Sequence, residues 1–143
     1  MKNATKLTAL LSLLILASLM LVLVGCGGIN TAKLWENATY QNDTTVGEGD
    51  TTFDITIRAG DKSIVLTVNT GETILGAALL AENIISGDMG DYGLYIKKVN
   101  GISADYDIDK AYWAFYIDGD YALTGVDATT ITEGAIYELV YTK

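Results

Sequence analysis

The stretch Thr52-Phe53-Asp54-Ile55-Thr56-Ile57-Arg58 decides the fold, because polar and apolar residues alternate strictly along it. A period of two places the three apolar side chains on one face of a β-strand and the polar ones on the other. The next four residues, Ala59-Gly60-Asp61-Lys62, are typical of a turn. Residues 63–68 are rich in β-branched side chains and predict a second strand. The folded part of the chain is therefore expected to begin near Thr52.

One helix is expected among the strands that follow. Thr73 can cap it, and the helix is expected to end in a loop of glycines and acids at 86–91. Asn100-Gly101 and Asp118-Gly119 are signals for tight turns between strands. A helix packed across one face of a small antiparallel, β-rich sheet makes the fold class α+β. The apolar stripe of the helix comprises Ile74, Leu75, Ala78, Leu79, Ala81 and Ile85, and further strands are expected at 94–99, 111–117, 120–123 and 135–142.

The N-terminus has the layout of a secretory signal segment over residues 1–25. Lys2 and Lys6 precede an uncharged, mainly apolar run over 7–24, and the small residue Gly25 precedes Cys26. Leu23-Val24-Gly25-Cys26 resembles the bacterial lipobox, which implies that Cys26 carries a diacylglycerol and becomes the first mature residue. An uncleaved membrane helix is the alternative, since the run approaches the length of a bilayer span. We expect a lipid-anchored protein outside the cytoplasm, at the cell membrane or cell surface.

The mature chain is strongly acidic. Removing residues 1–25 leaves seven basic and 18 acidic residues, a net charge of −11. Such a charge argues against nucleic acid as a partner and against peripheral binding to anionic lipid. Residues 26–51 are mostly polar and lack apolar periodicity, so they predict a flexible tether from Cys26. One domain is then expected over residues 52–143.

Residues with catalytic potential are scarce. The chain has no histidine, and its single cysteine is assigned to the lipid. Its serines lie in no nucleophile motif, and no phosphate-binding glycine loop is present. We therefore expect a binding protein without enzymatic activity.

Two groups of residues are candidates for binding. The first is acidic, and an irregular calcium site is one interpretation of it. An EF-hand is excluded, because Lys110 stands where that loop needs glycine and Tyr116 where it needs glutamate. Solvated loop acids are the plainer interpretation. The acids concerned are Asp88, Asp91, Asp105, Asp107 and Asp109.

The second group is the aromatic run 112–116. Strand alternation predicts that Trp113, Phe115 and Ile117 face the core, while Tyr112 and Tyr116 lie on the opposite face. Tyrosine combines apolar area with a polar tip, which suits a flat ligand or a partner surface. Tyr92, Tyr95, Tyr106 and Tyr121 are candidates to widen such a patch.

The order of short motifs along 52–142 resembles the domain of unknown function DUF4430, a family similar to the C-terminal β-domain of the cobalamin carriers transcobalamin and gastric intrinsic factor. The motifs are Thr70-Gly71-Glu72-Thr73, Ala78-Leu79, Tyr95-Ile96, Val99-Asn100-Gly101, Tyr112-Trp113, Gly125-Val126, Glu133-Gly134 and Tyr137-Glu138-Leu139.

The resemblance implies a β-rich domain with one helix and a small ligand, cobalamin or another corrinoid. The large helical barrel of the carriers is absent from this sequence, so any binding by the lone domain should be weaker. No histidine is available to coordinate cobalt. The protein would hand its ligand to a transporter or present it at the surface; a surface adhesion or protein–protein module is the alternative. By the matching motifs, the expected ligand-binding residues are Val99, Asn100, Gly101, Tyr112, Trp113, Phe115 and Tyr116.

Overall fold

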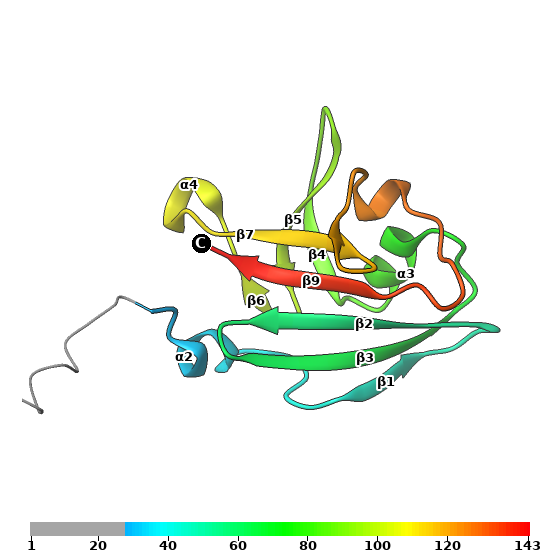
Figure 1. Ribbon diagram of the computed structural model, residues 1–143, viewed down its shortest axis with the longest axis horizontal. Coiled ribbons are helices and arrows are strands. Elements are labelled where there is room, and N and C mark those ends of the chain that lie inside the picture. The colour runs from blue at the N-terminus through cyan, green and yellow to red at the C-terminus, as the bar shows by residue number, and fades with distance from the viewer. Residues whose placement is uncertain (1–27) are drawn as a thin grey trace, which may run out of the picture.

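The structure is a computed structural model that describes residues 28–143. It confirms the α+β class: most of the regular secondary structure lies in two β-sheets, with a few short helices (Figure 1). The predicted signal segment and Cys26 lie outside the described residues. Within 28–143, no helix is long and apolar enough to cross a membrane.

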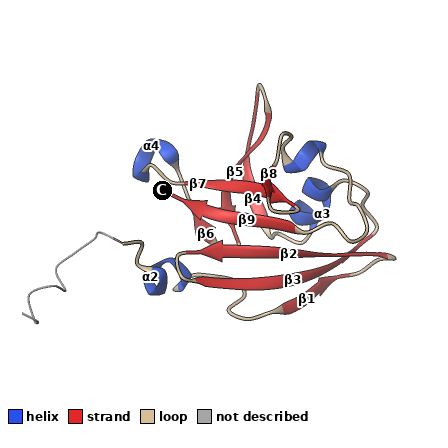
Figure 2. Ribbon diagram, viewed as in Figure 1, coloured by secondary structure: helices blue, strands red, loops and turns tan. Residues whose placement is uncertain are grey.

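A six-stranded sheet has the order β1-β3-β2-β9-β7-β8, and a three-stranded sheet has the order β4-β5-β6. Figure 2 shows β4 and β5 running steeply across the direction of β7 and β9. The strands are β1 (Thr44–Gly47), β2 (Thr51–Ala59), β3 (Lys62–Thr70), β4 (Ile85–Gly90), β5 (Gly93–Val99), β6 (Ile102–Ser103), β7 (Tyr112–Ile117), β8 (Asp120–Tyr121) and β9 (Tyr137–Thr142). The helices are α2 (Thr31–Trp35), α3 (Leu75–Ala81), α4 (Tyr106–Asp109) and the 3-10 turn η2 (Val126–Ala128).

The six-stranded sheet is mixed rather than purely antiparallel. β2 and β3 form the predicted hairpin, but β1 runs parallel to β3, and β9 runs parallel to β2 with Ile55 opposite Tyr137. β9 then pairs antiparallel with β7, where Phe115 lies opposite Leu139. β9 comes to lie parallel to β2 because the chain leaves this sheet after β3, builds α3 and the second sheet, and returns for β7 and β9. β1, which precedes β2 in the chain, pairs with the other side of β3.

The core lies on one face of the six-stranded sheet. The predicted alternation in β2 is confirmed, since its apolar residues are buried and most polar ones are not. Tyr137 sits at the centre, edge-on to Phe53 at 5.9 Å between ring centroids and stacked with Phe115 at 6.4 Å. Its hydroxyl accepts a hydrogen bond from the Thr132 N–H at 2.8 Å. Burying the ring while satisfying its polar tip makes Tyr137 a central packing residue.

Helix α3 begins where the sequence predicts it, but it ends at Ala81, and Ile85 of the predicted apolar stripe is the first residue of β4. Its cap also differs. Ile74, not Thr73, is the N-cap, and it makes no side-chain capping bond. The segment after η2 supplies partners instead: Leu75 N–H donates to the Thr129 carbonyl at 2.8 Å, and Ile131 N–H donates to the Thr73 carbonyl at 2.9 Å. The Thr129 carbonyl thus accepts a hydrogen bond at the start of α3 that a capping side chain would otherwise accept.

The predicted loop at 86–91 is wrong, because Ile85–Gly90 forms β4, paired with β5. Only Ile85 of this strand is buried, so no apolar alternation marks it in the sequence. The two predicted tight turns are confirmed. Asn100 and Gly101 have φ of 51° and 80°, and Asp118 and Gly119 have φ of 53° and 85°, as a two-residue hairpin turn requires.

The prediction of a flexible tether over 26–51 is wrong for most of its length. Asn30 caps α2 by accepting a hydrogen bond from Lys33 N–H, and β1 adds to the six-stranded sheet. Trp35 is only 3% exposed, and its indole N–H donates to the Ala59 carbonyl at 2.9 Å. One buried tryptophan and one parallel edge strand are enough to fix the segment, and neither has a periodic signal. The domain therefore begins near Asn30 rather than Thr52.

The Trp35→Ala substitution should lower the free energy of unfolding by about 3–5 kcal/mol, because it removes a buried aromatic ring and orphans the Ala59 carbonyl. Urea unfolding of the purified chain, followed by circular dichroism, measures the change. Ile29→Ala, a change of an exposed residue just before α2, serves as the control. An unchanged midpoint in Trp35→Ala would mean that the segment is a tether after all.

Candidate functional site

A groove of about 300 Å³ lies along the free side of β7. Two aromatic residues of its lining, Trp113 and Phe115, project from the core face of β7, and β5 supplies the facing wall. None of the lining side chains is charged. The complete lining is Leu94, Tyr95, Ile96, Tyr112, Trp113, Phe115, Tyr121, Ala122, Leu123, Thr124, Gly125 and Val126.

The segment from Tyr121 to Val126 closes one end of the groove and is held by three contacts. Ala122 N–H donates to the Phe115 carbonyl at 2.9 Å. The Thr129 hydroxyl donates to the Gly125 carbonyl at 2.8 Å and lies 3.3 Å from the Thr124 hydroxyl. Val126 is buried in the core. These contacts give the groove a fixed end wall, although Leu123 itself is fully exposed.

Trp113 carries the most informative feature of the groove. The side chain is 7% exposed and packs edge-on against Tyr141, with 5.7 Å between ring centroids. Its Nε1 is buried and is the one side-chain donor or acceptor among the described residues found buried without a hydrogen-bond partner. Leaving such a donor unpaired costs roughly 1–3 kcal/mol. An acceptor that reached this buried nitrogen would remove that cost.

The aromatic part of the sequence prediction agrees with this geometry in part. Tyr112, Trp113 and Phe115 all line the groove, whereas Tyr116 does not and stacks edge-on with Tyr121 at 5.5 Å. Of the four tyrosines considered as additions, Tyr95 and Tyr121 line the groove, and Tyr92 and Tyr106 do not. The predicted division of faces holds for Trp113 and Phe115, which are buried against the core.

The sequence predicts a strand over 120–123, but β8 ends at Tyr121, and the residues that follow it form the end wall instead. Its place at the groove follows from the turn at Asp118-Gly119, which directs the chain back along β7.

Val99, Asn100 and Gly101, predicted to bind ligand, belong to the framework instead. Val99 and Asn100 are 0% exposed. The Asn100 side chain accepts from Tyr40 N–H at 2.8 Å and donates to the Tyr40 carbonyl at 2.9 Å, so its amide is already in use. Its backbone N–H donates to the Ile84 carbonyl at 2.7 Å, and its carbonyl accepts from Thr39 N–H at 2.9 Å. The polar groups of Asn100 therefore already have hydrogen-bond partners within the fold.

Gly101 lines a different cavity, of about 460 Å³, formed with residues that precede and include α2 and with the C-terminal end of the chain. A Cβ at Gly101 would lie 2.5 Å from the Asn37 carbonyl oxygen, so glycine permits the close approach of the N-terminal segment. Tyr141 also lines this cavity, and burial, with a contribution from Asp109, raises the pKa of its hydroxyl. The glycine therefore has a packing role.

The acids considered for calcium are not assembled into a site. Asp88 forms an ion pair with Lys97 at 2.8 Å, and this hydrogen bond raises the pKa of Lys97. Asp105 accepts from Asp107 N–H, and Asp109 accepts from Ala111 N–H, so both carboxylates stabilise the start and end of α4. Within residues 28–143, no three Asp, Glu, His or Cys side chains gather in a way that could hold a metal ion.

Comparison with known proteins gives one family. Residues 71–137 match the family described as "Domain of unknown function (DUF4430)". No curated protein matches the chain.

Two solved structures are similar to it. One is the crystal structure of a "putative metal binding protein" from Ruminococcus gnavus ATCC 29149, with 29% identity, a TM-score of 0.61, and coverage of 66% of this chain and 98% of that one. The other is haptocorrin in complex with Cbi, with 17% identity, a TM-score of 0.46, and coverage of 68% of this chain and 27% of that one.

The Asn100→Ala substitution should destabilise the fold by about 2–4 kcal/mol, because it leaves the Tyr40 N–H and carbonyl without partners. Asn83→Ala is a matched control: Asn83 also has a positive φ, of 54° against 51° for Asn100, but it is exposed. Both variants place alanine at a positive φ and so incur the same kind of backbone strain. The difference between their free energies of unfolding in urea therefore reports the buried hydrogen bonds of Asn100. Equal losses in the two variants would contradict the framework role of Asn100.

Proposed function

We propose that this chain is a lipid-anchored, extracytoplasmic binding protein without enzymatic activity, and that the groove along β7 takes the apolar edge of a small-molecule ligand. The observation that carries the proposal is an uncharged groove lined by five aromatic residues, one of which, Trp113, has a buried Nε1 without a hydrogen-bond partner. Ligand pockets typically combine an apolar lining with a few polar groups that fix orientation. The ligand we propose therefore presents an apolar edge and one hydrogen-bond acceptor.

A corrinoid is the ligand we propose for this groove. Corrinoids carry amide side chains around an apolar macrocycle, and an amide carbonyl is a suitable acceptor for Nε1. A volume of about 300 Å³ is too small to enclose a corrin ring, so the groove would take one edge of it. Most of the ligand would then stay open to solvent or to a partner, which predicts modest affinity.

A metal ion is the competing ligand, because the similar protein from Ruminococcus gnavus is described as a putative metal binding protein. The described residues bring together no cluster of metal ligands. A corrinoid carries its own cobalt within the macrocycle, so binding it requires no such cluster. This difference in chemistry is why we place the ligand in the aromatic groove and not among the acidic loops.

The anchor is proposed from the sequence around Cys26. Since α2 begins at Thr31, only four residues separate Cys26 from a packed element. A chain spans at most about 3.6 Å per residue, so the domain would lie within roughly 20 Å of the lipid. The protein would hold its ligand close to the membrane, where a transporter could receive it.

Cyanocobalamin titrated into the purified chain in detergent should give a saturable calorimetric signal. Trp113→Phe should weaken binding about threefold to tenfold, because it removes one hydrogen-bond donor and keeps an aromatic ring. Tyr112→Ala should also weaken binding, whereas Tyr92→Ala, a change of a fully exposed tyrosine outside the groove, is the control. No signal at high micromolar cyanocobalamin would rule out the corrinoid.

Cys26→Ser should remove the lipid and release the protein from the membrane fraction, because the chain then lacks the thiol that receives the diacylglycerol. Mass spectrometry of the mature N-terminus and cell fractionation measure the two effects. Ser86→Ala, a change within the folded domain, is the control. A wild-type chain that retains Met1 and an unmodified Cys26 thiol would contradict the anchor.

A further inference from the structure

We propose that the open edge of β7 also docks an extended, cationic segment of another polypeptide as an added β-strand. This goes beyond the small-ligand function, because it uses the backbone of β7 and not the indole of Trp113. The inference starts from the hydrogen bonds that the edge leaves unmade.

β8 covers only the last part of β7. It pairs with Tyr116 and Ile117, and beyond it Ala122 N–H reaches the Phe115 carbonyl. Backbone groups alternate in direction along an antiparallel strand, so the N–H and C=O of Trp113 point to the same side as the Phe115 carbonyl. Among the described residues, no strand pairs with Trp113 on that side. An unpaired edge of this kind is a template for an added strand.

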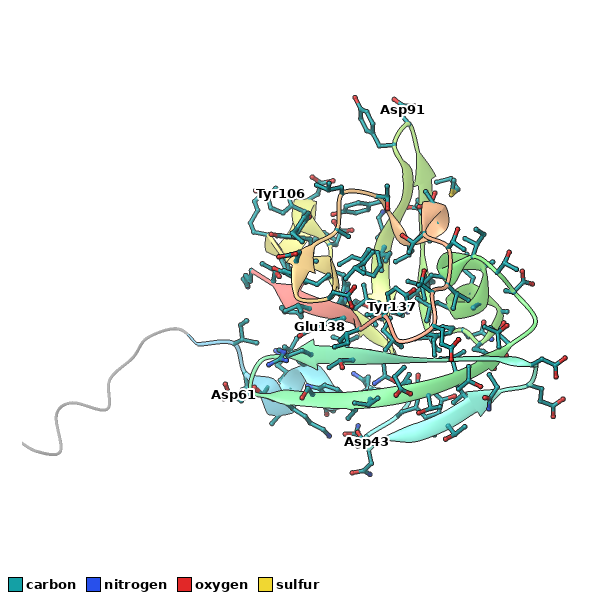
Figure 3. The ribbon with its side chains drawn as sticks, turned by 45° about the vertical axis from the view of Figure 1, so that its right-hand side comes forward. Asp43, Asp61, Asp91, Tyr106, Tyr137 and Glu138 are labelled. Carbon is teal, nitrogen blue, oxygen red and sulfur yellow. The ribbon has the colours of Figure 1, made fainter. Side chains whose placement is uncertain are left out.

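The space beside Trp113 and Phe115 is the groove already described. In Figure 1 the uncovered half of β7 lies between α4 and the projecting β4–β5 hairpin. Figure 3 shows Asp91 at the tip of that hairpin, directed away from the body, and Tyr106 on α4. The groove runs along this edge, so alternate side chains of an added strand would face its aromatic lining.

The charge of this region indicates the chemistry of the partner. Residues 88–127, which form every element around the edge, contain eight aspartates and three lysines, for a net charge of −5. Lys97 is already paired with Asp88, and Lys110 lies over the Tyr106 ring at 5.0 Å. Asp120 and Asp127 flank the end wall of the groove in sequence, and neither carboxylate forms a hydrogen bond or ion pair within residues 28–143.

The negative charge around the edge indicates which kind of polypeptide could supply the added strand. A second copy of the chain would bring another strongly acidic surface to the edge, and like charges would oppose the pairing. A segment with lysines or arginines beside apolar residues would gain both electrostatic attraction and burial in the groove. We therefore commit to a cationic, strand-forming segment of a different protein.

The probe is a ten-residue peptide of alternating lysine and valine, titrated into the full chain in detergent. Binding should slow hydrogen exchange at the Trp113 amide and should weaken as salt rises. Trp113→Ala and Trp113→Pro form a matched pair, since both remove the indole and only proline removes the outward N–H. Proline is tolerated at an edge position whose N–H faces away from the sheet. Trp113→Pro should bind at least about tenfold more weakly than Trp113→Ala.

Two further peptides test the proposal without altering the protein. A version with alternate N-methylated amides cannot form the ladder, and a glutamate-valine version reverses the charge; both should fail to bind. Equal binding of the N-methylated peptide, equal affinities of the two Trp113 variants when both are folded, or no binding of the lysine peptide at about 1 mM would overturn the proposal. Trp113→Phe keeps the backbone edge, so it should bind the peptide normally while losing affinity for cyanocobalamin, and this separates the two functions.

Discussion

The shortness of β8 is the constraint from which the functional features follow. Two residues pair with β7 after the turn at Asp118-Gly119, and the chain then leaves the sheet. Had β8 continued, it would have satisfied the outward backbone groups of Trp113 and covered the ring beneath them. Because β8 stops at Tyr121, part of the edge of β7 stays open, and the residues that follow form the end wall of a groove instead of continuing the strand. One early departure from the sheet thus creates both the cavity and the unpaired edge.

The sequence predicts well those elements whose side chains divide between water and core. The strict alternation over 52–58 gives β2, and the two turns are marked by residues that accept a positive φ. Prediction from the sequence fails for elements whose formation depends on contacts with distant parts of the chain. β4 has one buried residue and is a strand only because β5 lies beside it. α2 and β1 are fixed by Trp35 and by parallel pairing with β3, and neither contact produces a pattern in the local sequence.

The same distinction applies to the candidate site: residues with a local sequence pattern could be predicted, and residues fixed by distant contacts could not. The aromatic run on β7 could be predicted to take part in binding. Trp113 and Phe115 are enough to fill the core face of this short strand, so the tyrosines on its other face are available for a ligand. Asn100 could not be distinguished from a ligand contact, since an asparagine before glycine marks a tight turn whether its side chain faces water or the interior. The structure shows that it faces Tyr40. That partner lies 60 residues earlier, in a segment without periodicity, so no local pattern reveals it.

Trp113 joins the two proposed interactions while keeping them chemically separate. Its side chain lies on the core side of the strand, where it lines a groove of limited volume that suits the edge of a ligand, and its indole donor is buried. Its backbone donor and acceptor lie in the plane of the sheet, where only another extended backbone can meet both at once. A small ligand in the groove and a strand on the edge would contact the same residue from perpendicular directions. The affinities for the two are therefore expected to be coupled, and the sign of the coupling depends on whether alternate side chains of the strand enter the space that the ligand occupies.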